Sequence, residues 1–241
     1  MRGRRGFWRR LLRRALLAVL GLLLLSVLMV AAARFVNPWT SGYMLQARVA
    51  SWFDAESRPF RMRQQWRDYS DISPHLALAV VASEDQRFPL HHGFDFRQIQ
   101  AAIEEAGRGG RMRGASTISQ QVARNLYLWN GRSWVRKGLE AWFTLWIETL
   151  WPKQRILEVY LNIAEFGPGI HGAEAAAQAF FNQPAAKLTR AQSARLAAVL
   201  PNPKRLSAAS PGPYVLQREQ EIQRQMAALG GMAWLPWDQR R

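Results

Sequence analysis

The sequence contains no cysteine. This absence excludes disulfide bonds, catalysis by a thiolate and metal sites with cysteine ligands, but it does not fix the compartment. Acidic residues are also scarce: 17 Asp and Glu stand against 33 Lys and Arg in 241 residues, for a formal net charge of +16. Such a basic chain favours an anionic partner, and charge alone leaves open nucleic acid, a lipid surface or a phosphorylated substrate. The length fits one ordinary domain with an appendage.

Charged residues are absent from positions 15–33, which are strongly apolar. With Leu11 and Leu12, the run reaches about the 20 residues that span a bilayer, so we predict a single transmembrane helix over 15–33. A cleaved signal peptide is the alternative, because residues 31–33 resemble a cleavage site, but its apolar core would be only about 7–15 residues long. Seven arginines lie within residues 1–14. They predict a cytoplasmic basic segment and a body outside the cytoplasm, which disfavours nucleic acid as the partner.

The remaining chain is predicted to be mainly α-helical, without internal repeats or a convincing series of strands. We expect a membrane-proximal connecting region over 34–70, with a short helix or strand at 43–53, then a domain over 71–230 and a tail over 231–241. Helical patterns and caps predict helices at 73–83, 95–106, 116–129, 133–151, 153–165, 172–181, 189–200 and 213–229. The helix over 133–151 carries an apolar stripe, from Val135 to Leu150, that we expect to be buried.

Two adjacent carboxylates, Glu84 and Asp85, end a buried helix that begins with Ser73 and Pro74. The helix macrodipole disfavours acids at a C-terminus, so they are an unusual choice for that position. Acids placed beside a turn by a buried helix can have shifted pKa values, which is typical of catalytic groups. A solvated helix end is the alternative. His91 follows; without a second ligand at metal-binding spacing, we interpret it as a hydrogen-bonding structural residue.

Cationic residues follow in two places. A Gly- and Arg-rich loop over 107–115 leads into a helix, an arrangement that can bind anions or can simply be flexible. Within that helix, Gln120 and Arg124 share a face. Further on, Arg136 and Lys137 lie one turn from Glu140, which suits either a surface ion pair or a phosphate site.

Five segments, in order, resemble the motifs of the peptidoglycan glycosyltransferases of family 51. They are Glu84-Asp85-x-x-Phe88-x-x-His91-x-Gly93-x-Asp95, residues 114–121 (GASTISQQ), Arg136-Lys137-x-x-Glu140, residues 155–162 (RILEVYLN), and Leu188-Thr189 with 194–203. Only 38 residues follow Pro203, too few for the transpeptidase domain of the bifunctional members. The resemblance is therefore to the monofunctional biosynthetic transglycosylases. Ala115, Ser119 and Gln192 depart from the usual residues; the fifth motif, which contains Gln192, is thought to be mainly structural.

The resemblance implies a lysozyme-like helical fold that polymerises lipid II by inverting glycosyl transfer and releases undecaprenyl pyrophosphate. It implies that Glu84 is the general base for the acceptor hydroxyl. Glu140 would orient the cations or stabilise positive character at the donor's anomeric centre. Fixed cations would stabilise the leaving pyrophosphate. The expected substrate-binding residues are Asp85, Phe88, Ser116, Gln120, Gln121, Arg124, Arg132, Arg136 and Lys137.

The resemblance also implies a bacterial inner membrane location with the catalytic domain on the periplasmic face. The partners would be lipid II, the growing lipid-linked glycan, the membrane and other cell-wall synthesis or division proteins, and not nucleic acid. Trp129, Trp134 and Phe94 either enter the membrane interface or belong to the core. No protein metal site is expected, and a divalent cation such as Mg²⁺ at the pyrophosphate stays open. Two other functions also stay open: a lysozyme-like hydrolase and a non-catalytic membrane-anchored binding module.

Overall fold

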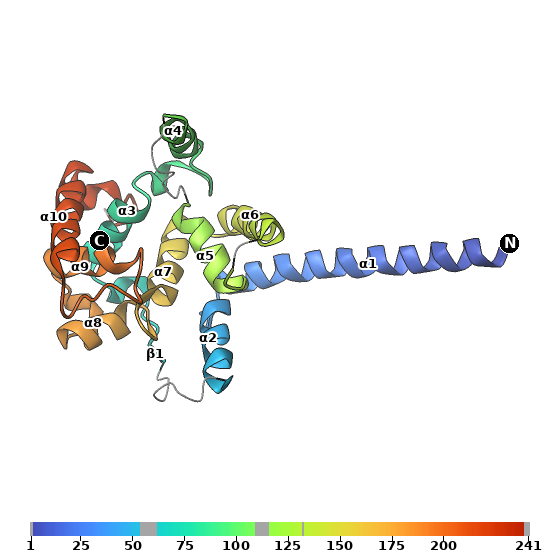
Figure 1. The fold of residues 1–241 in the computed structure, drawn as a ribbon, viewed down its shortest axis with the longest axis horizontal. Coiled ribbons are helices and arrows are strands. Elements are labelled where there is room, and N and C mark those ends of the chain that lie inside the picture. The colour runs from blue at the N-terminus through green and yellow to red at the C-terminus, as the bar shows by residue number, and fades with distance from the viewer. Residues whose placement is uncertain (1, 54–61, 109–115, 132, 239–241) are drawn as a thin grey trace.

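The computed structural model describes residues 2–53, 62–108, 116–131 and 133–238. It confirms a mainly helical body preceded by one long N-terminal helix (Figure 1). The helices are α1 (Arg2–Ala33), α2 (Gly42–Phe53), α3 (Pro74–Glu84), α4 (Phe96–Gly107), α5 (Ile118–Tyr127), α6 (Trp134–Leu150), α7 (Lys153–Ile163), α8 (Ala173–Phe181), α9 (Arg190–Val199) and α10 (Pro213–Ala228). Short 3-10 helices lie at Tyr69–Asp71, Phe88–Leu90, Ala185–Lys187 and Gly231–Trp234.

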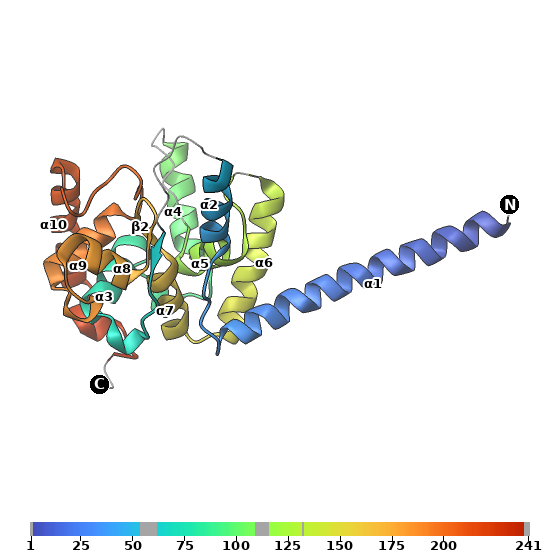
Figure 2. The same ribbon diagram turned by 90° about the horizontal axis from the view of Figure 1, so that it is seen from below.

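The α1 helix projects from one side of the body, and α6 and α2 lie on that side, whereas α9 and α10 lie on the far side (Figure 2). Its residues Phe7–Ala33 are long and apolar enough to cross a membrane, and few of them are buried in the protein. The last turns of α1 pack on α6. There the indole of Trp142 donates to Ser26 Oγ at 3.0 Å, and that of Trp151 donates to the Val30 carbonyl at 2.8 Å.

The end of α1 is held by Arg155 of α7. Its Nη2 donates to the carbonyl oxygens of Ala33 and Val36 at 3.0 and 3.1 Å, and its Nη1 donates to Asn37 Oδ1 at 2.8 Å. Carbonyl groups in the last turn of a helix lack partners within the helix, and a cation there also interacts favourably with the helix dipole. The apolar helix is therefore fixed to the body rather than joined by a free linker.

The core centres on α3 and α7. Residues 76–82 of α3 are all buried, which is the pattern of a helix covered on every side, here mainly by α9 and α10. Ser73 and Pro74 begin α3 as predicted, but Ser73 Oγ donates to the Leu188 carbonyl at 2.7 Å and does not cap the helix. The apolar stripe predicted for α6 is buried or partly buried from Leu139 to Leu150, but Val135 is exposed. The prediction was wrong for Val135, because helical spacing identifies a face of a helix but not how far along it other elements reach.

Three very short strands were not predicted. They are β1 (Arg63–Gln64), β2 (Glu165–Gly167) and β3 (Ile170–His171), in the order β1-β3-β2, with β1 parallel and β2 antiparallel to β3. Strands of two or three residues are too short to show an alternating pattern. Gly172 follows with φ +83°, and a Cβ there would lie 2.7 Å from the Asn162 carbonyl oxygen, so only glycine fits this turn into α8.

Other helix ends match the predictions. Asp95 caps α4, and Thr117 and Thr189 cap α5 and α9 in capping boxes. Gln192 accepts from the Thr189 amide at 2.9 Å, so it makes a capping bond that Glu would also make. Residues 231–238, the described part of the predicted tail, pack on the body. Leu235 is fully buried, and the Trp237 indole donates to the Tyr69 hydroxyl at 2.9 Å.

Candidate active site

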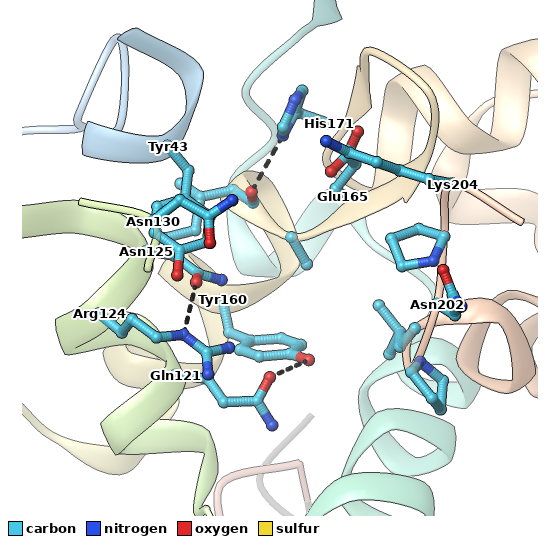
Figure 3. A pocket seen from close by; sticks show the side chains of 15 residues that line it. Tyr43, Gln121, Arg124, Asn125, Asn130, Tyr160, Glu165, His171, Asn202 and Lys204 are labelled. Carbon is cyan, nitrogen blue, oxygen red and sulfur yellow. Dashed lines mark hydrogen bonds between the residues drawn. The ribbon is translucent and has the colours of Figure 1, made fainter. Parts of the chain in front are cut away.

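Glu84 lies at the C-terminal end of α3 and is half-buried. Its Oε2 accepts from Gln121 Nε2 of α5 at 2.8 Å. Gln121 Oε1 in turn accepts from the Tyr160 hydroxyl of α7 at 3.2 Å, as Figure 3 shows. Three helices therefore fix the carboxylate through one chain of hydrogen bonds. The sequence predicted Glu84 and Gln121, whereas Tyr160 was missed, although it lies inside the fourth motif-like segment.

The surroundings of Glu84 shift its proton affinity. Burial raises the pKa of this carboxyl above its ordinary value, while the Gln121 hydrogen bond and the charges of Arg218 and Arg124 oppose that rise. Burial also raises the pKa of Tyr160 well above its usual range, and the nearby Glu84 charge adds to this. Tyr160 therefore stays a neutral hydroxyl donor. A carboxylate with a raised pKa suits the acceptance of a proton in a reaction.

Asp85 has a different position from its neighbour. It is buried, and both oxygens lie 3.0 Å from His91 Nε2, while Oδ2 also accepts from the Ile118 amide at 3.0 Å. Gly93 completes the same junction with φ +85°, and its carbonyl accepts from Thr117 Oγ1 at 2.7 Å. Asp85 thus joins the turn after α3 to the start of α5. This geometry fits support of the site, and His91 has the structural role that was predicted for it.

Several predicted substrate contacts do not fit their surroundings. Phe88 is fully buried, with Lys153 Nζ 4.4 Å from its ring centroid and Trp237 packed edge-on, so it is a core residue and cannot contact substrate here. Gln120 is also buried, and its Oε1 accepts from the Thr117 amide at 3.0 Å in the capping box. Ser116 is half-buried before α5, and its role stays a prediction. Arg132 lies outside the described residues.

A pocket of about 460 Å³ opens beside Gln121 and Tyr160. Figure 3 shows α5 side chains on one wall and the segment after α9 on the other. The labelled lining residues are Tyr43, Gln121, Arg124, Asn125, Asn130, Tyr160, Glu165, His171, Asn202 and Lys204. Of these, the sequence predicted only Gln121 and Arg124. Glu165 and His171 enter through the pairing of β2 with β3, which no pattern indicated.

Arg124 shares the positive charge of this pocket with Lys204, which also lines it. Arg124 Nε donates to Asn125 Oδ1 at 3.3 Å, and its guanidinium lies 5.9 Å from the Tyr43 ring centroid. No acidic side chain forms an ion pair with it within the described residues. Its charge is therefore available to an anionic ligand, and substrate binding by Arg124 stays a prediction.

Glu140 forms a second centre on α6. Its side chain is 3% exposed, Arg136 Nη1 donates to Oε2 at 3.1 Å, and Lys137 Nζ donates to Oε1. A surface ion pair is the wrong description, because the carboxylate is buried. Lys137 is 46% exposed and lines a shallow pocket of about 300 Å³ with Arg136, Ser133 and Trp134.

The two centres remain separate in this structure. Among the described residues, no hydrogen bond or ion pair links Glu84 or Gln121 to Glu140 or its cations. No group of three or more His, Asp or Glu side chains in the described part of the chain is arranged to hold a metal ion. A substrate that used both centres would therefore have to reach from one to the other.

Comparisons with known proteins agree with this geometry. A family model described as Transglycosylase matches residues 53–227. Two relatives named "Biosynthetic peptidoglycan transglycosylase" cover nearly all of the chain. The protein of Chromohalobacter salexigens is 56% identical over 231 residues, 96% of this chain and 98% of the relative. That of Xanthomonas oryzae pv. oryzae is 55% identical over 228 residues, 95% of this chain and 93% of the relative.

These matches show that the chain is a glycosyl-transferring enzyme. Within that class, the chain belongs to the transglycosylase family. The resemblance seen in the five motif-like segments is therefore confirmed over most of the length.

Proposed function

We propose that this transglycosylase is a peptidoglycan polymerase that joins lipid II units by inverting glycosyl transfer. The family membership supports glycan-chain polymerisation. The observation that carries the finer proposal is the Glu84 carboxylate, held by Gln121 beside a pocket that also contains Arg124.

Glu84 acts as the general base in this proposal. A sugar hydroxyl is a weak nucleophile until a base removes its proton in the transition state. The 4-hydroxyl oxygen of the acceptor GlcNAc bonds to the anomeric carbon of the donor MurNAc, and its proton passes to Glu84. The bond from that carbon to the pyrophosphate oxygen breaks, and undecaprenyl pyrophosphate leaves with the electron pair. Direct displacement inverts the anomeric configuration and requires no covalent intermediate.

The cations stabilise the leaving group. Negative charge develops on the pyrophosphate as the bond breaks, and fixed positive charges lower the energy of that transition state. Arg124 supplies one such charge at the pocket. Lys137 and Arg136 supply others at the second centre, where buried Glu140 holds both side chains in place. A divalent cation such as Mg²⁺ stays a proposal, and at the pyrophosphate it would add positive charge that stabilises the leaving group.

The apolar helix α1 fits a membrane anchor. The proposal places it in the bacterial inner membrane with the body on the periplasmic side, because the arginines precede the apolar run. Trp134 is 92% exposed, and Trp129 is also exposed, so both suit the membrane interface, whereas Phe94 is partly buried. Protease added outside intact spheroplasts should digest the body, and full protection would contradict this orientation. Other cell-wall synthesis and division proteins remain proposed partners.

The decisive experiment incubates the purified full-length protein with labelled lipid II in detergent or vesicles. A polymerase converts it to lipid-linked glycan, and the product shows the inverted linkage. Cleavage of added glycan without polymer formation would indicate a lysozyme-like hydrolase. Binding of lipid II without any product would indicate the non-catalytic module. The Arg124 charge favours the polymerase, because a hydrolase has no pyrophosphate leaving group to stabilise.

A further inference from the structure

One arginine of α10 reaches the end of α3 that carries the proposed base. Arg218 Nη2 donates to the Ser83 carbonyl at 3.4 Å, although the two residues are 135 positions apart. Ser83 precedes Glu84, and its hydroxyl lies 3.5 Å from Glu84 Oε1. The carbonyl groups in the last turn of a helix have no partner within the helix. Arg218 therefore supplies a partner at the turn where the macrodipole is negative.

Arg218 lies outside the five motif-like segments, which end at Pro203. It also pairs with Glu221 on its own helix at 3.1 Å, and its side chain is 23% exposed. α10 packs against both α3 and α9. The position of Arg218 is thus set by helix packing and not by the pocket that contains Arg124.

Charged and titratable groups face Glu84 from several elements. Arg124 approaches from α5, Tyr160 from α7 and Arg218 from α10. Asp85 follows on its own element, but His91 and the Ile118 amide engage its oxygens. The helix α9 and the 3-10 helix at 231–234 also pack on α3, and no charged group of theirs acts on Glu84. Within the described residues, Arg124 and Arg218 are the cations that favour the ionised carboxylate.

We propose that Arg218 is a positioning residue for glycosyl transfer, which holds the C-terminal turn of α3 and keeps Glu84 ionised and ready to accept a proton. The inference rests on the proposed function of Glu84 as the base. Arg124 is free to bind the anionic substrate, and a bound phosphate would neutralise its effect on Glu84. Arg218 is held by Ser83 and Glu221 and does not line that pocket, so substrate binding there leaves its effect on Glu84 unchanged.

Arg218→Gln removes the charge and keeps a hydrogen-bond donor. Loss of a nearby positive charge raises the pKa of a carboxyl group. The ascending limb of kcat against pH should therefore move to higher pH by about 0.5–1 unit, below the full effect of a close ion pair because Arg218 is partly exposed. At pH values on the ascending limb, turnover of the variant should be about 3–10-fold below that of wild type, and the difference should disappear at higher pH.

Arg195→Gln is the matched control. Arg195 is 28% exposed and joins α9 to α10 through Glu219 at 2.7 Å, but it does not act on Glu84. It should change the thermal midpoint about as much as Arg218→Gln does, with no movement of the limb. Arg218→Lys keeps the charge and should leave the limb within about 0.3 pH unit of wild type.

The outcomes separate the two proposals. Wild-type protein that makes no polymer from lipid II would refute the proposed function itself. Active wild type with an Arg218→Gln limb at the wild-type pH, and a uniform loss of rate, would show that Arg218 is only structural. A limb that moves equally in Arg195→Gln would overturn the inference as well. If Arg218→Gln does not fold, Arg218→Lys decides: a folded Lys variant whose limb moves up by a full unit contradicts the proposal.

Discussion

Replacing Glu84 by Gln separates chemistry from folding at this site. The amide keeps the size of the carboxylate, and its oxygen can still accept from Gln121 Nε2, which now lies at 2.8 Å. It cannot take a proton from a sugar hydroxyl. Positioned proton transfer contributes about 10²–10⁴-fold to a rate, equivalent to about 2.7–5.5 kcal/mol of activation free energy. We expect polymerisation to fall by roughly 100-fold or more.

The same substitution should not destabilise the protein. Burial raises the pKa of Glu84 in the folded state, so the fold favours the protonated carboxyl. That contribution to stability is complete below the unfolded pKa and is lost as the pH rises through the folded pKa. At neutral pH the ionised carboxylate is therefore unfavourable for folding, and a neutral amide removes this effect. The thermal midpoint of Glu84→Gln should equal or exceed that of wild type.

The assay follows labelled lipid II consumption over pH, together with thermal unfolding and lipid II binding. Wild type should show an ascending limb in kcat that Glu84→Gln lacks, while binding persists. Glu219→Gln, which loses its pair with Arg195 and is not among the groups that act on Glu84, is the control and should keep the limb. A limb that persists in Glu84→Gln but disappears in Glu140→Gln would assign the base to the other centre. Normal polymerisation by both variants would refute the reasoning altogether.

Three further predictions concern the surrounding network. Lys137→Ala should lower turnover on the order of 100-fold with little change in thermal midpoint. Arg136→Ala should lower both turnover and thermal midpoint, because buried Glu140 would lose its more buried partner. Kinetics and calorimetry on both variants test this, and unchanged turnover in both would show that the ion pairs are purely structural. Asp85→Asn should lower the thermal midpoint by roughly 5–10 °C, since it weakens buried charge-assisted bonds to His91 and Ile118; an unchanged midpoint contradicts this. Arg155→Gln should speed hydrogen exchange of the amides at 34–37 by about tenfold or more, because it frees the end of α1, and unchanged exchange would show that the cap is not needed.

Local signals predicted much of this fold. Helix caps such as Asp95 and Thr117, and the breaker Pro152, act within a few residues, so the sequence contains all of the relevant chemistry. The buried α3 followed from its uninterrupted apolar run. Val135 was misplaced because helical spacing identifies a face but not the element that covers it. The sheet was not predicted because the paired residues of β1 and β3 are 107 positions apart in the sequence and each strand is only two residues long.

Some residues of the candidate site were predicted from the sequence, and others were not. Glu84 and Gln121 were predicted because they lie in motif-like segments, and Arg124 because it lies just beyond the second of them. Phe88 lies in such a segment too, yet it is buried under Lys153 and Trp237. A motif shows that a residue type is needed at a position, and it does not distinguish contact with substrate from support of the fold. Burial made that distinction, and it came only from the structure.

The position of Glu84 explains why the site draws on so many elements. A carboxylate at a helix C-terminus meets the negative end of the macrodipole, and burial disfavours its charge further. The chain opposes both effects from outside α3, through the Gln121 amide on α5 and the arginines on α5 and α10. The proton affinity of Glu84 is then a balance between burial and these contacts. A change on α3, α5 or α10 therefore shifts the pH at which the base works. Such a balance depends on residues far apart in sequence, which is why no single stretch could have revealed it.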